Sequence, residues 1–246
     1  MNEPSAARQL RIDLAACYRL IDRFDMSDLI FTHITARSPD RDDAFLINRY
    51  GQLFGEIRAS DLVEVDASGQ VLSGDGPINP SGFAIHAAIH RARRDALCVI
   101  HTHSVAGIAL SACRSGLLPL SQHAMKFHER IGYHDYEGIV LGEDEGRRLV
   151  HALGTHSAAI LRNHGLIAIG RTIAEAFHVI YHLEIACRVQ VRVLAACRDS
   201  SDMLMAAPEI AERVARQFEA FPQPLGRREW PALIRLLDRT SPDYRE

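Results

Sequence analysis

The sequence has little net charge, no long apolar run and few cysteines, and each shortage excludes a class of protein. The 246 residues carry a formal charge of −3, so no basic surface is expected to bind nucleic acid or an anionic membrane. No stretch approaches the roughly 18 apolar residues of a membrane-spanning helix, and the N-terminus lacks the basic-then-apolar order of a signal peptide. Five scattered cysteines without a CxxC pair fit reduced, buried thiols. We therefore expect a cytoplasmic protein with no nucleic-acid or membrane partner.

Strand-like and helical segments interleave through the middle of the chain, which indicates an α/β fold with one central sheet. Apolar periodicity predicts a helix over 7–24, and Ser81 is the expected N-cap of a helix over about 82–93. Thr172 is the expected N-cap of a long helix that runs to Cys197. The remaining elements are strands within 29–72, 96–103, 138–142 and 157–170, and helices over 104–113 and 143–153.

Two histidines one residue apart stand at the end of an apolar run, in "VIHTHSVAG" (99–107). Because alternate residues of a strand share a face, His101 and His103 can direct two imidazoles at one metal ion. His164 lies in "RNHG" between two strand-like runs, where Gly165 permits a tight turn that aims the ring inward. Three neutral nitrogens with an open position form the ligand set of a catalytic metal rather than of a structural one. On spacing alone, hydrogen-bonded histidines without a metal stay an equal alternative.

Other histidines carry weaker signals. Two pairs lie four apart on helices with apolar stripes, which favours core or helix-surface positions over ligand roles: His86 with His90, and His178 with His182. A second group crowds one loop region and supplies second-rank candidates for acid, base or ligand roles: His123, His128, His134, Glu129 and Asp135.

At these motifs the sequence resembles the class II aldolase/adducin family, and in particular the adducin head domain and its bacterial relatives. The resemblance runs from about residue 8 to 198 and rests on "THITAR", "NPSGFAIHAAI", "VIHTHSVAGIALSA", "YHDYEGIV" and "ILRNHGLIAIG". It implies one three-layer α/β/α domain over 1–199 with a central, mainly antiparallel sheet, assembled as a homotetramer. It also implies that His101, His103 and His164 bind a divalent metal, Zn²⁺ first, with Fe²⁺ and Mn²⁺ as alternatives. Residues 200–246 are expected to form a helical arm that packs on this domain or on a neighbouring subunit.

Departures from the family's pattern concern proton transfer and phosphate binding. Aldolases of the family carry an acidic residue four positions before the histidine that matches His86, and here that position is Gly82. Their phosphate-binding loop is rich in glycine and asparagine, whereas "THITAR" has the bulkier His33 and Ile34. A tyrosine that reaches the neighbouring subunit's site in the aldolases falls at His123. The metal ligands of the pattern are therefore present, and its acid–base and phosphate-binding groups are not.

These observations favour a metal-dependent lyase, of aldolase or decarboxylase type, that acts on a small hydroxy or keto substrate through an enediolate-like intermediate. Because Gly82 cannot move a proton, three residues are candidates for that role: His123, Glu129 and His33. Three polar residues are expected to orient the substrate: Thr32, Asn79 and Ser81. One alternative is a non-haem iron oxygenase that acts on an aromatic acid. The other is a non-catalytic, adducin-like assembly protein, which the missing acid favours and the three-ligand set opposes.

Overall fold

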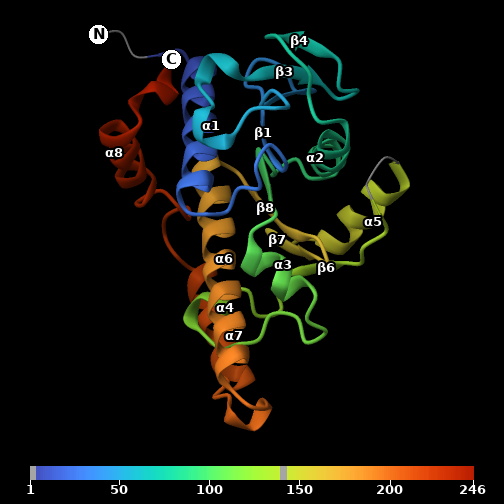
Figure 1. The fold of residues 1–246 in the computed structure, drawn as a ribbon, viewed down its shortest axis with the longest axis vertical. Helices are drawn as coiled ribbons and strands as arrows, with labels where there is room; N and C mark the ends of the chain where they lie inside the picture. Colours follow the sequence, from blue (N-terminus) through green and yellow to red (C-terminus); the bar gives the residue numbers. More distant parts are fainter. Residues whose placement is uncertain (1–3, 139–142) are drawn as a thin grey trace.

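The computed structural model describes residues 4–138 and 143–246 (Figure 1). Its strands are β1 (His33–Arg37), β2 (Ala44–Ile47), β3 (Val63–Asp66), β4 (Val71–Ser73), β5 (Cys98–Thr102), β6 (Gly132–His134), β7 (Ala158–Leu161) and β8 (Gly165–Gly170). Its α-helices are α1 (Ala6–Arg23), α2 (Pro80–Ala92), α3 (Val105–Ser111), α4 (Gln122–Met125), α5 (Glu143–Leu153), α6 (Ile173–Ala196), α7 (Pro208–Glu219) and α8 (Trp230–Thr240). Apart from Gly138, the strand expected over 138–142 lies outside the described residues.

In the described part of the chain the strands form one sheet in the order β4-β3-β2-β1-β5-β8-β7-β6. Neighbouring strands are antiparallel except for the parallel pair β6 and β7. Helices α2 and α5 cover one face of the sheet, and α1, α3 and α6 cover the other (Figure 1). The predicted α/β/α fold with a mainly antiparallel sheet is therefore confirmed.

The alternation of side chains along β5 decides which face of the sheet carries the histidines. Cys98 and Ile100 join the core beneath α1 and α6, whereas Val99 packs beneath α2 and α5. Since alternate residues share a face, His101 lies on the α2 side with Val99. In the antiparallel register His33 of β1 is the direct partner of His101. The start of β1 and the end of β5 therefore bring two histidines together beneath α2.

The start of α2 corrects one prediction. Asn79, and not Ser81, caps this helix: its side chain accepts a hydrogen bond from the Gly82 N–H at 3.4 Å. The physical reason is Pro80, which has no N–H to satisfy and a fixed φ, so it takes the first helical position and moves the cap to the residue before it. Thr172 caps α6 as predicted, and that helix ends at Ala196.

The last part of the chain packs against the elements already described. Helix α8 lies against α1, where Leu237 and the following Tyr244 are buried in the main core. Helix α7 lies against α4, and Arg130 forms ion pairs with Glu212 and Glu219. The division of the chain at residue 199 stays a prediction. Among the described helices, none is both long and apolar enough to cross a membrane.

Candidate metal centre

Two imidazoles meet at the end of β5. The Nε2 atoms of His101 and His103 lie 3.0 Å apart. On the far side of each ring, Nδ1 of His101 lies 3.0 Å from the Leu166 carbonyl oxygen, and Nδ1 of His103 lies 2.9 Å from Oδ2 of Asp28. Each ring is therefore held by an oxygen at one nitrogen and turned toward its neighbour at the other.

The two outer contacts determine where the ring protons are. A carbonyl oxygen and an ionised carboxylate only accept hydrogen bonds, so Nδ1 of His101 and Nδ1 of His103 both donate. In a neutral ring Nε2 then carries a lone pair, and the two lone pairs face each other across 3.0 Å. Two acceptors cannot hydrogen-bond to each other, and a cation between them removes the conflict. Histidine ligands of metals are oriented by this kind of second hydrogen bond.

His164 completes a group of three. It lies in the turn between β7 and β8, and its ring centroid is 4.8 Å from that of His101 and 4.8 Å from that of His103. One nitrogen from each ring lies within 4.8 Å of the others. The turn requires glycine at position 165, because a Cβ there would lie 2.3 Å from the Thr102 carbonyl oxygen. The sequence spacing and the fold thus converge on the same three rings.

Burial keeps two of these imidazoles, those of His101 and His164, in the form that binds a metal. Burial, followed by repulsion from the neighbouring rings, lowers the pKa of His164 to about 4 and the pKa of His101 well below its usual range. Neutral imidazole is the ligating form, so these rings need release no proton at pH 7 when an ion binds. Three imidazole nitrogens, with no fourth ligand grouped with them among residues 4–138 and 143–246, fit a divalent transition ion at an open, catalytic type of site.

Asp28, which orients His103, was not anticipated from the sequence. It lies in the turn between α1 and β1, 75 residues before its partner, and no motif marks it. Arg188 on α6 donates to the carbonyl oxygens of Phe24 and Asp25 at 2.7 and 3.2 Å, which anchors this turn. The orientation of the ring therefore depends on a helix from the other end of the sequence.

Glu184 connects that anchor to the other side of the centre. One of its oxygens accepts a hydrogen bond from Arg188, and the other accepts from the hydroxyl of Ser104, the residue after His103. Burial raises the pKa of Glu184, and the hydrogen bonds from Ser104 and Arg188 oppose that rise. A single buried carboxylate on α6 thus supports both the α1–β1 turn and the end of β5.

His33 occupies the space that a side chain at position 82 would need. A Cβ on Gly82 would lie 1.6 Å from the Cδ2 and Nε2 atoms of the His33 ring. The same ring lies 4.2 Å from that of His86 and 5.4 Å from that of His101, centroid to centroid. Burial lowers the pKa of His33 to about 3, so the imidazole is neutral at pH 7. A ring able to carry a proton therefore lies beside the metal-ligand candidates, at the place where position 82 has no acidic side chain.

The predicted substrate-orienting residues lie just before β1 or at the start of α2, in different settings. Thr32, directly before His33, is buried with a φ of 69°, and its Oγ1 has no hydrogen-bond partner within residues 4–138 and 143–246. Asn79 is engaged as the cap of α2. Ser81 lies half-buried in the first turn of that helix.

Two of the predicted acid–base residues do not join the centre within one chain. His123 lies against His182 of α6, with ring centroids 5.2 Å apart. Glu129 is exposed, with a φ of 54°. Across the described residues, neither has a hydrogen bond, ion pair or ring contact with the three metal-ligand candidates. Of the three candidates, the fold brings only His33 to the centre.

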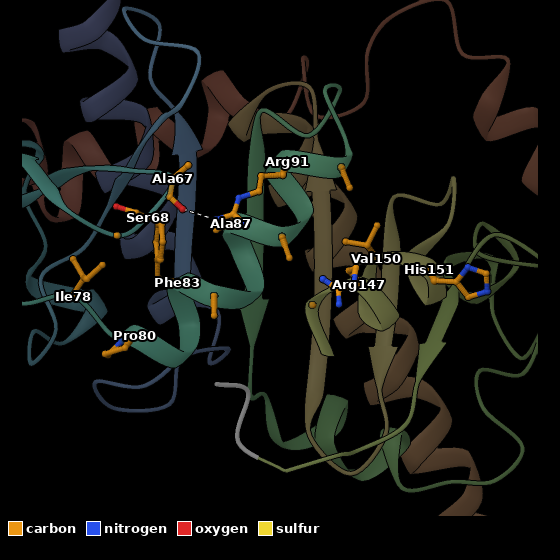
Figure 2. A pocket seen from close by; sticks show the side chains of 15 residues that line it. Ala67, Ser68, Ile78, Pro80, Phe83, Ala87, Arg91, Arg147, Val150 and His151 are labelled. Atoms are coloured by element: carbon orange, nitrogen blue, oxygen red, sulfur yellow. Dashed lines mark hydrogen bonds between the residues drawn. The ribbon is translucent and has the colours of Figure 1, made fainter. Parts of the chain in front are cut away.

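A groove of about 1010 Å³ opens between α2, α5 and the β3–β4 turn, and none of the three histidines lines it (Figure 2). Phe83 and Ala87 of α2 and Val150 of α5 contribute its apolar walls. His164 lines a separate cavity of only about 10 Å³. The candidate metal centre is therefore marked by its converging nitrogens and not by the size of a cavity.

The chain is similar to known proteins along most of its length. The family description "Class II Aldolase and Adducin N-terminal domain" matches residues 12–191. A crystal structure of an aldolase II superfamily protein from Pseudomonas syringae is 42% identical, covers 100% of this chain and 98% of that one, and superposes with a TM-score of 0.94. An L-fuculose 1-phosphate aldolase from Glaciozyma antarctica PI12 is 26% identical, with coverages of 100% and 97% and a TM-score of 0.86. Alpha-adducin from Rattus norvegicus is 40% identical over an alignment of 253 positions, which covers 96% of this chain and 34% of that protein.

Proposed function

Because the chain belongs to the class II aldolase and adducin family, we propose that it is a metal-dependent lyase. The reaction is the aldol-type cleavage or the decarboxylation of a small hydroxy or keto substrate. A bound divalent ion, Zn²⁺ in the first place, supplies a Lewis acid for a substrate oxygen. The similarity to a solved fuculose-phosphate aldolase supports this class of reaction.

The observation that carries the proposal is the pair of opposed lone pairs at His101 and His103. Hydrogen bonds to the Leu166 carbonyl and to Asp28 support one tautomer for each ring, and that tautomer leaves both Nε2 atoms as acceptors. Two facing lone pairs cannot form a hydrogen bond with each other, and burying them in an apolar core would leave both acceptors unsatisfied. With His164 as the third ligand, an open coordination position is left for a substrate.

We assign the proton transfer to His33. Its ring fills the space beside Gly82, and burial lowers its pKa to about 3, so it is an unprotonated base at neutral pH. His123 and Glu129 stay candidates for the centre of a neighbouring copy, since they make no contact with the centre of their own chain in its described part. Thr32 and Ser81 are the proposed substrate-orienting groups. Asn79 joins them when its side chain exchanges the hydrogen bond from the Gly82 N–H for one with the substrate. The buried Oγ1 of Thr32, unpaired within the described residues, supports this role.

The environment of the centre supports an assembly that completes it. Large apolar side chains are exposed around it: Leu29 and Phe31 after Asp28, Val105 and Ile108 on α3, and Tyr136, whose ring lies 5.9 Å from His164. A second copy that covers these side chains would remove them from water and enclose a substrate. We therefore propose a homo-oligomer, with a tetramer as the form implied by the family.

The two alternatives differ in how well the site supports them. The usual oxygenase site has two histidines and one carboxylate as ligands. Here the carboxylate of Asp28 is hydrogen-bonded to Nδ1 of His103, which argues against a role as the third ligand. The similarity to alpha-adducin favours the non-catalytic assembly protein, and an intact set of three nitrogen donors opposes it.

A metal-exchange assay tests the proposal. Protein stripped with a chelator and reloaded with Zn²⁺, Mn²⁺ or, without oxygen, Fe²⁺ is mixed with hydroxy acids, keto acids and ketoses, with and without phosphate. We expect aldehyde or CO₂ release only from reloaded protein, and a decrease in kcat of about 100-fold for His33→Gln at unchanged metal content. His151→Gln, on the exposed side of α5, is the matched control and should keep full activity.

Two results would overturn the proposal. Oxygen uptake with an aromatic acid by the iron form, without lyase activity of any form, would establish the oxygenase. Absence of turnover by every metal form that has retained its ion would favour the assembly protein.

A further inference from the structure

A cavity of about 170 Å³ lies between α6, the end of α1 and the start of α8, and none of the three metal-ligand candidates lines it. Four aromatic side chains contribute to its wall: Phe24, Phe177, Tyr181 and Trp230. Their rings form one contiguous group. The centroid distances are 5.1 Å from Phe24 to Tyr181, 6.0 Å from Tyr181 to Phe177, and 5.9 Å from Phe177 to Trp230. Aromatic rings therefore make up most of the apolar wall.

Two contacts fix the wall of this cavity. Nε1 of Trp230 donates a hydrogen bond to Oδ1 of Asp13 at 3.1 Å, which ties the indole ring to α1. Gly226, in the segment before α8, has a φ of 79°, and a Cβ there would overlap the Ala174 carbonyl oxygen of α6. Glycine therefore lets this segment pass close to α6 and bring Glu229 to the edge of the cavity.

His178, His182 and Glu229 add polar groups to the same wall. Oε1 of Glu229 lies 3.3 Å from Nδ1 of His178. Because an ionised carboxylate only accepts hydrogen bonds, it favours the proton of this ring on Nδ1, and Nε2 then carries a lone pair. His178 is 8% exposed, and its Nε2 is buried without a hydrogen-bond partner among residues 4–138 and 143–246. Nδ1 of His182, whose ring centroid is 4.0 Å from that of His178, is also buried without a partner there.

The charges around the cavity determine the sign of a ligand that fits it. Among the described residues that line it, Glu229 has the one ionised side chain. Burial lowers the pKa of His178 and of His182 to about 3, so both rings are neutral at pH 7. Lys126, whose charge also lowers these two pKa values, does not line the cavity, and burial lowers its own pKa to about 7. The wall therefore offers a negative charge, a lone pair and aromatic faces.

We propose that this cavity binds a small organic ammonium ion, which places its charge beside Glu229 and the aromatic rings and donates an N–H to Nε2 of His178. Aromatic faces attract cations, and ammonium ligands are recognised in this way. The N–H donor also satisfies the buried lone pair, which an apolar ligand would leave unsatisfied. Since drug-sized ligands occupy about 300–1,000 Å³, a cavity of about 170 Å³ fits only a small amine. The inference depends neither on the metal centre nor on the lyase reaction.

Three probes with one aromatic ring each and different charges test the proposal: benzylammonium, benzyl alcohol and benzoate. Trp230 is the only tryptophan of the chain and lines the cavity, so its fluorescence reports on binding, and calorimetry gives the affinities. Metal-free protein is used at pH 8, where Lys126 is largely neutral. We expect a saturable signal with benzylammonium, an affinity about tenfold higher than for benzyl alcohol, and no saturable signal with benzoate.

Variants assign the binding to this cavity. Glu229→Gln removes the charge with little change of shape and should weaken benzylammonium binding about three- to fivefold, because the carboxylate is partly exposed. Glu209→Gln makes the same change at an exposed position of α7 and should leave the affinity unchanged. His178→Phe retains a ring, removes the lone pair and should weaken benzylammonium binding about tenfold.

Several results would overturn the inference. Equal affinities for benzylammonium and benzyl alcohol, or tighter binding of benzoate, would contradict the assigned charge of the ligand. The absence of saturable binding by all three probes, or an affinity unchanged in both Glu229→Gln and His178→Phe, would contradict the assigned site. Should His178→Phe not fold, the order of the three probes on the unmodified protein and the effect of Glu229→Gln still decide.

Discussion

Replacement of Gly82 by alanine tests the relation between this glycine and His33. A glycine in a helix is usually improved by alanine, which gains about 0.5–1 kcal/mol in helix stability. Gly82 lies in the first turn of α2 and has no positive φ, so its backbone accepts an alanine. Without the ring of His33, the substitution should therefore stabilise the protein.

The ring reverses the expected sign. A Cβ at position 82 would lie 1.6 Å from two ring atoms of His33, which is packed between His86 and His101. Overpacking of a filled core costs about 1–3 kcal/mol, and an overlap this deep belongs at about 2–3 kcal/mol. After subtraction of the helix gain, Gly82→Ala should lower the free energy of unfolding by about 1–2.5 kcal/mol. In a His33→Ala background the same substitution should raise it by about 0.5–1 kcal/mol.

Urea unfolding of the four proteins of this double-mutant cycle measures both signs. Trp230 is the only tryptophan and packs on Phe177 at 5.9 Å, so its fluorescence reports on the core. The metal is removed beforehand, because an ion that binds only the folded form would add its own stabilisation. If Gly82→Ala stabilises the protein in both backgrounds, the His33 ring does not occupy this space and its assignment as the base loses its support.

Three further predictions follow from single contacts. Asp28→Ala removes the partner that orients His103, so metal affinity should fall about 10- to 100-fold in a chelator competition, with Asp199→Ala as the control. Burial lowers the pKa of His33 and of His90 to about 3, below the unfolded value of about 6.5. Between these two values the unfolded state therefore binds more protons than the folded state. The stability that is present above pH 6.5 is lost as the pH falls toward 3. Each group should contribute a slope of about 1.4 kcal/mol per pH unit in urea titrations between pH 6 and 4, and one such slope should vanish in His90→Gln. The Tyr18 hydroxyl accepts from two buried backbone N–H groups, so Tyr18→Phe should cost about 1–3 kcal/mol of unfolding free energy in urea, whereas replacement of exposed Tyr136 by phenylalanine should cost little.

The three metal-ligand candidates could be found from the sequence because their signal is local. Strand alternation places His101 and His103 on one face, and a glycine beside His164 marks a turn. The start of α2 also carries a local signal in Pro80, but the cap was predicted at Ser81, and the structure places it at Asn79 instead. Such features depend on neighbours within a few residues.

The supporting groups could not be predicted because their contacts cross the sequence. Asp28 reaches His103 from 75 residues away, and the Leu166 carbonyl reaches His101 from 65 residues away. The fit of His33 into the space at Gly82 depends on the register of β1 with β5 and on the placement of α2 above them. His86 and His90 were expected at core or helix-surface positions, and the structure buries both. Their connection through Thr35 is visible only once strand and helix are packed.

The most direct test of the central claim is the metal content of protein purified without a metal-affinity tag, prepared both with and without oxygen. The account predicts about one divalent ion per chain, strongly reduced in His101→Ala, His103→Ala and His164→Ala and retained in His178→Ala. A chain without metal in either preparation, or an equal loss in His178→Ala, would contradict it.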